Sequence, residues 1–153
     1  MKDFLGKLGG LFSSDDSVRV NSTEEQVQVA AAALMVHAMR IDDETRPEER
    51  DRVRLVLQER FGIDSNELDT LIEKGTAEDD EAVDLYRFTK VLTANLDQPG
   101  RQKIVRMLWE VVAADGEVHE FEANLVWRIA ELLGVSRQDR IRMRQEVVAG
   151  STG

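Results

Sequence analysis

The stretch VVAADGEVHEFEANLVWRIAELLGV, residues 111–135, decides the fold of this chain. Its two ends carry apolar residues at helical spacing, and the polar pair Asp115 and Gly116 lies between them. Glycine readily adopts the left-handed conformation that ends a helix, so Gly134 marks the end of the second helical part. The stretch therefore predicts a helix, an acidic loop and a second helix.

The same arrangement occurs a second time in MRIDDETRPEERDRVRLVLQERFGI, residues 39–63. Aligning the two loops pairs their acidic residues and, across a one-residue gap, pairs Gly62 with Gly134. Such a repeat predicts two related helical halves, packed about a pseudo-two-fold axis as one bundle. The acidic pairs are Asp42 with Asp115, Glu44 with Glu117, and Glu49 with Glu122.

The rest of the chain also has the pattern of helices. Capping residues and helical apolar spacing recur, and no segment shows the sustained alternation of a strand. We expect Gly75 to end a short third helix, Thr76 to cap a fourth, and the acidic cluster at 78–84 to complement the dipole of that helix start. The predicted class is all-α: a single bundle of about seven helices built from two related helix-turn-helix halves, with the wide apolar stripe of 97–112 at its centre. The expected ranges are 22–41, 45–61, 64–75, 76–92, 97–112, 121–133 and 136–147.

Composition and charge exclude several functional classes. The chain has 153 residues, 30 acidic and 20 basic side chains, a formal net charge of -10 and no cysteine. Without cysteine there is no disulfide framework, zinc–thiolate site, iron–sulfur cluster or thiol nucleophile. The acidic balance opposes nucleic-acid binding, and no apolar run is long enough to span a membrane. We expect a cytoplasmic protein of one domain.

No catalytic pattern emerges from the remaining residues. The sequence has no spaced Ser, His and Asp motif and no glycine-rich phosphate loop, so we expect no enzyme. His37 lies on a helix face beside apolar residues and is expected to be partly buried with a polar partner. The aromatic residues expected in the core are Tyr86, Phe88, Trp109 and Trp127.

The amino-terminal segment is set apart by glycines and a polar linker. Residues 1–12 form an amphipathic pattern that we expect to dock onto its own bundle or a partner, or to contact a membrane surface weakly. The expected organisation is this segment and its linker at 1–20, the helical domain at 21–148 and a flexible end at 149–153. The apolar face consists of Phe4, Leu5, Leu8, Leu11 and Phe12, with Lys2 and Lys7 elsewhere.

The second loop resembles that of the tellurite-resistance protein TerB family. In the family motif an aspartate and a glycine are followed at fixed distance by a small apolar residue and a glutamate. Asp115, Gly116, Val118 and Glu122 occupy these positions. The resemblance covers about residues 22–147 and extends to the N-terminal domain of certain membrane-tethered DnaJ-like co-chaperones.

The first loop departs from this motif. Asp42 and Glu49 match it, but Asp43 replaces the glycine and Thr45 replaces the apolar residue. The resemblance implies a helical, non-enzymatic protein with a role in tellurite resistance or a wider envelope and metal-stress response. It also implies divalent metal binding and a membrane-protein partner.

The spacing of the second loop is also that of the last part of an EF-hand calcium loop. The first part is missing because Val111 and Ala113 carry no side-chain oxygen. If the two halves face each other, carboxylates of both loops would converge and suit a hard divalent cation, Ca²⁺, Mg²⁺, Mn²⁺ or Zn²⁺. The candidate ligands are Asp42, Glu49, Asp115 and Glu122, with Glu44, Glu117 and His119 as additional ones.

The same residues have a purely structural interpretation. A helix–loop–helix corner favours an aspartate that accepts backbone N–H groups and a glutamate that complements the next helix dipole. A partner-binding surface is a third interpretation. The predicted function is a TerB-like stress-response module that binds a divalent cation. The alternative is a metal-independent protein adaptor or co-chaperone-like module, either free in the cytoplasm or peripheral to the inner face of the membrane.

Overall fold

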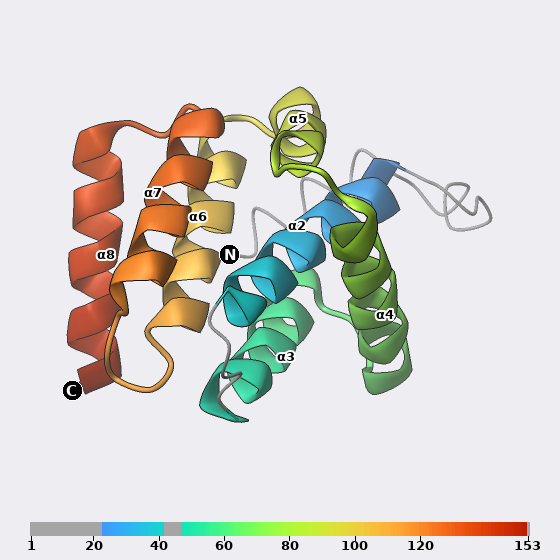
Figure 1. The fold of residues 1–153 in the computed structure, drawn as a ribbon, viewed down its shortest axis with the longest axis horizontal. Coiled ribbons are helices and arrows are strands. Elements are labelled where there is room, and N and C mark those ends of the chain that lie inside the picture. Colours follow the sequence, from blue (N-terminus) through green and yellow to red (C-terminus); the bar gives the residue numbers. More distant parts are fainter. Residues whose placement is uncertain (1–22, 42–46, 153) are drawn as a thin grey trace.

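The computed structural model describes residues 23–41 and 47–152, with side chains up to residue 150. These residues form seven α-helices and no strand, which confirms the all-α prediction. None of these helices has both the length and the apolar character needed to cross a bilayer. Predictions about the amino-terminal segment, Asp42, Glu44 and the cap at Thr45 lie outside the described residues. The helices are α2 (Thr23–Arg40), α3 (Pro47–Phe61), α4 (Ser65–Glu81), α5 (Tyr86–Asn95), α6 (Gln98–Val112), α7 (Glu120–Leu132) and α8 (Arg137–Thr152) (Figure 1).

The helices form two groups that meet where α6 packs against both α2 and α3. In one group α2 packs against α3 and α4, and in the other α6 packs against α7 and α8. Helix α5 lies at the top of the view in Figure 1, between α4 and α6 in the chain. The helices α2, α3 and α4 thus correspond in order to α6, α7 and α8, as the sequence repeat predicted.

Matching glycines follow the second helix of each group. Gly62 follows α3 with φ 63°, and Gly134 follows α7 with φ 73°. After the left-handed turn, the backbone N–H of Val135 donates to the carbonyl of Ala130 at 2.9 Å. This pattern satisfies a carbonyl in the last turn of α7 and redirects the chain into α8.

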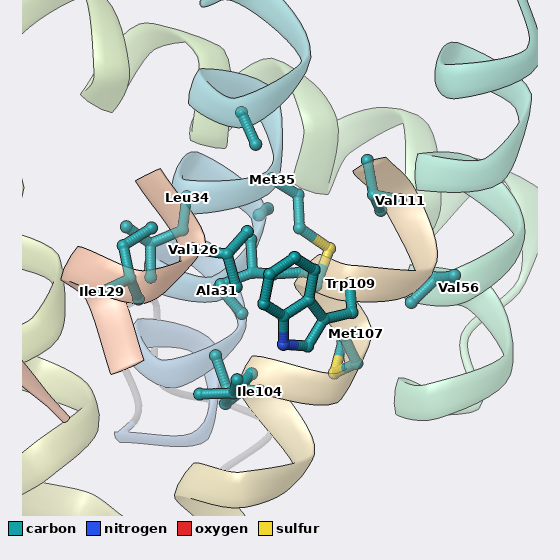
Figure 2. Packing of buried hydrophobic residues seen from close by; sticks show 14 of the residues in the cluster. Ala31, Leu34, Met35, Val56, Ile104, Met107, Trp109, Val111, Val126 and Ile129 are labelled. Carbon is teal, nitrogen blue, oxygen red and sulfur yellow. The ribbon is translucent and has the colours of Figure 1, made fainter. Parts of the chain in front are cut away.

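Trp109 lies at the centre of the core. Its side chain is fully buried, among side chains of α2, α6 and α7 (Figure 2). The rings of Trp109 and Trp127 meet edge to face, with centroids 5.9 Å apart and planes at 81°. Trp127 is only partly buried, and the guanidinium of Arg140 lies 5.5 Å from its ring centroid. Helix α6 is therefore central, as its wide apolar stripe predicted.

Several helices begin with the capping side chains that the sequence predicted. Asp64 accepts the backbone N–H of Glu67 at 2.8 Å, and the Glu67 carboxylate accepts that of Asp64 at 3.0 Å. Asp97 caps α6 and Ser136 caps α8 by accepting N–H groups of their first turns. Helix α8 continues to Thr152, past the domain boundary predicted at residue 148.

One predicted helix boundary is wrong, because α4 runs through Gly75 and ends only at Glu81. Gly75 lies where α4 crosses α2: a β-carbon there would lie 2.9 Å from the β-carbon of Ala32. Thr76 caps no helix, since its hydroxyl donates to the carbonyl of Ile72 at 2.7 Å within α4. Glycine is required here for the close approach of two helices rather than for a turn.

The acidic cluster at 78–84 therefore does not lie in a first helical turn. Most of it forms the carboxyl end of α4, where the helix dipole disfavours negative charge. Cationic side chains from neighbouring helices compensate. Arg40 of α2 donates to Asp80 at 2.7 Å, and Arg87 of α5 donates to Glu78 at 2.6 Å.

Several apolar residues predicted to face the core are exposed instead. Tyr86 is 58% exposed and Phe121 is 76% exposed, and both lie in the first turn of their helices. Phe88 is buried as predicted. The apolar stripe of these helices is wider than the face that neighbouring helices cover, so its edges reach solvent. The other exposed residues that belong to the apolar pattern of the predicted helices are Leu55, Val83, Leu132 and Ile141.

Candidate functional site

The α6–α7 loop is organised by Asp115. One carboxylate oxygen of Asp115 accepts the backbone N–H of Glu117 at 3.1 Å, and the other lies 3.3 Å from Nε2 of His119. Gly116 has φ 88°, a left-handed conformation that favours glycine. Val118 is partly buried and packs against the core, as the motif predicts for its apolar position. Asp115 thus closes the turn in the way that the structural interpretation predicted.

A buried glutamate follows each loop in the sequence. Glu122, in the first turn of α7, is 1% exposed, and so is its counterpart Glu49 in the first turn of α3. A helix amino terminus favours a carboxylate. Complete burial of a charge is nevertheless costly unless hydrogen-bond donors, a proton or a cation compensate. The repeat therefore places an acidic group at the same buried position in both halves.

The other predicted ligands are less closely grouped. Glu117 is exposed, whereas His119 is partly buried beside Asp115. Asp42 and Glu44 belong to the first loop, outside the described residues. Across 23–41 and 47–152, no three histidine or acidic side chains lie close enough together to hold a metal ion. The second loop alone therefore forms no metal cage, and a site shared by both loops stays a prediction.

A second candidate site lies at the carboxyl end of α2, where sequence reasoning predicted none. A hollow of about 800 Å³ opens between α2, the α4–α5 connection and α7. Nδ1 of His37 lies 2.9 Å from a carboxylate oxygen of Asp79, which confirms that this histidine is partly buried with a polar partner. Arg40 donates to Asp79 at 3.3 Å and to Asp80 at 2.7 Å. The hydrogen bond to Asp80 and the negative charges of both aspartates raise the pKa of Arg40.

The sequence does not predict the hollow, because the acidic cluster at 78–84 has the pattern of a helix start. Only an uninterrupted α4 brings Asp79 beside α2. The sequence contained one usable signal: His37 and Arg40 are three residues apart and therefore share a face of α2. Two such side chains at a helix end are suited to an acidic neighbour from another element.

The chain is thus a small all-α bundle whose two helix–loop–helix units each carry a buried glutamate in the first turn of the second helix. The family model described as "Tellurite resistance protein TerB" matches residues 28–145. The chain therefore belongs to the TerB family, whose members are in general not enzymes. No protein with a curated description and no solved structure gives a significant match. The matched range includes both loops, both buried glutamates and the hollow at the carboxyl end of α2.

Proposed function

We propose that this TerB protein is a non-enzymatic module of a tellurite-resistance or related stress response that binds one divalent cation between its two acidic loops. The observation that carries this proposal is the burial of Glu49 and Glu122 at equivalent positions of the two halves. Carboxylates repeated at equivalent positions of two halves could supply oxygen ligands to one hard cation from both sides. Asp42 and Asp115 would complete a set of four carboxylate ligands.

The chemistry of these residues suits a hard cation. Carboxylate oxygens are the ligands that Ca²⁺, Mg²⁺ and Mn²⁺ prefer. The imidazole of His119, already beside Asp115, would favour Zn²⁺ if it joined the set. Glu44 and Glu117 are further carboxylates of the same two loops.

A thermal melt tests this proposal. The protein is first stripped with EDTA and then heated with Ca²⁺, Mg²⁺, Mn²⁺ or Zn²⁺ at about 100 times the dissociation constant measured by calorimetry. A ligand of the folded state then adds about 2.7 kcal/mol to the free energy of unfolding. In a chain of this length that corresponds to a rise in Tm of about 5–10 °C. A Tm unchanged by every cation would refute the metal site.

Matched variants locate the site. Asp115→Asn keeps an acceptor for the N–H of Glu117, so a merely structural Asp115 predicts little change in any melt. The cation site predicts that the shift is lost in Asp115→Asn and in Glu122→Gln. Glu120→Gln is the control, because Glu120 is exposed on the same first turn of α7 and should keep the full shift.

The second candidate function is a metal-independent adaptor for a protein partner, in the cytoplasm or at the inner face of the membrane. The observation that favours it is Phe121, 76% exposed beside the second loop. A large aromatic side chain in this position resembles the anchors of protein interfaces. Under this alternative the melts are identical with and without cations, and Phe121→Ser leaves Tm unchanged because no core contact is lost.

A further inference from the structure

The hollow at the carboxyl end of α2 combines a charged rim with a group of exposed large apolar side chains. Seven large apolar side chains in the described part of the chain are exposed, and four of them line this hollow. Val83, in the α4–α5 connection, is 99% exposed. Single exposed apolar residues are ordinary, whereas a contiguous group around a concave surface marks a docking site. The four residues are Ile41, Val83, Tyr86 and Leu132.

The rim of the hollow is charged and held in place. Arg40 donates hydrogen bonds to Asp79 and Asp80, and Asp79 also contacts His37. Asp84 adds a further negative charge, and Arg128 of α7 adds a positive one. The aspartates of the rim outnumber its arginines, so the surface suits an amphipathic segment with apolar residues on one face and lysines on the other.

We propose that the amino-terminal segment of this same chain, residues 1–12, docks as a helix in this hollow. The segment places five large apolar residues at helical spacing, and both of its basic residues are lysines. The apolar face would cover Ile41, Val83, Tyr86 and Leu132, and the lysines would meet the aspartates of the rim. Docking here buries the apolar surface of both partners, which neither can bury alone.

The length of the chain allows this contact. Helix α2 has 18 residues and is about 27 Å long, and the hollow lies at its far end from Thr23. Residues 13–22 lie between the segment and α2, and a ten-residue linker spans up to about 33–36 Å. Because a short linker holds the segment at an effective concentration in the millimolar range, docking within one chain is favoured over a partner in solution.

Paramagnetic broadening in the full-length protein tests the proposal. The chain has no cysteine, so Ser13→Cys provides a single site for a nitroxide label. We expect strong broadening of the methyl signals of Ile41, Val83 and Leu132, and none at Leu55 of α3, which is also exposed. If the methyl signals of Leu55 broadened as much as those of the hollow, the proposal would be overturned, since the segment would have no preferred position.

Two variants and one mixture complete the experiment. Leu8→Asp in the segment and Val83→Asp in the hollow should each reduce the broadening several-fold, whereas Leu55→Asp should leave it unchanged. Val83 is almost fully exposed, so its replacement disturbs no core packing. In a mixture of nitroxide-labelled and isotope-labelled molecules, broadening between molecules would show that a second copy supplies the segment and would overturn docking within one chain.

Discussion

Replacing Gly75 by alanine tests the close crossing of α2 and α4. At an open helical position this change stabilises a protein by up to about 1 kcal/mol, because alanine is the better helix former. At position 75 the added β-carbon would lie 2.9 Å from the β-carbon of Ala32 and 3.1 Å from backbone atoms of Ala32 and Ala33. Carbon atoms normally pack at about 3.5–4.0 Å, and backbone atoms do not rotate away. Overpacking of this kind costs about 1–3 kcal/mol, so we expect a net loss of about 1–2 kcal/mol.

Urea unfolding followed by circular dichroism measures this loss. For a chain of this length, 1–2 kcal/mol also lowers Tm by about 2–8 °C. Gly150→Ala in α8 is the matched control, since nothing lies within 4 Å of its new β-carbon, and it should be neutral or stabilising. Ala32→Gly removes the closest contact, so it should cost less stability in the Gly75→Ala background than in the wild type. If Gly75→Ala were as favourable as the control, the close crossing of α2 and α4 would be refuted.

Two smaller changes test the local signals that begin and end helices. Asp64→Ala removes the reciprocal cap of α4 and should cost about 1 kcal/mol in urea unfolding, whereas Asp64→Ser keeps an acceptor and should cost less. Gly134→Ala forces a β-carbon into the left-handed conformation at φ 73° and should cost about 1 kcal/mol, with Gly134→Asn closer to wild type. An unchanged midpoint for either alanine variant would contradict the role assigned to that residue.

Much of the fold was predictable because its signals are local. Asp64 and Asp97 begin helices through hydrogen bonds to residues only a few positions away, and Gly134 ends one through its own backbone conformation. Position 75 is also a glycine, but for a different reason: the close contact with Ala32 leaves no room for a β-carbon. Sequence spacing does not distinguish a glycine that ends a helix from one that lets a neighbouring helix approach.

The candidate site residues show the same difference between local signals and tertiary contacts. The second loop could be predicted because its signals are local: Asp115 interacts with Glu117 and His119, and Gly116 makes the turn through its own backbone conformation. The burial of Glu122 could not, because a glutamate in a first helical turn is usually exposed and only tertiary packing covers it. Exposure of Phe121 beside it has the same origin: the two neighbours lie on different faces of α7, and the helical pattern assigned the apolar one to the core.

The sequence repeat also explains why the two proposed sites differ in kind. The acidic loops belong to the repeated part of the chain, so each half contributes the same type of residue, and a ligand held between them would be bound by equivalent groups. The hollow uses the α4–α5 connection, which lies between the two repeated helix–loop–helix units and belongs to neither. Val83 and Tyr86 are exposed there. An unrepeated surface of this kind suits a single asymmetric occupant, and the amino-terminal segment, which is likewise present once, meets that requirement.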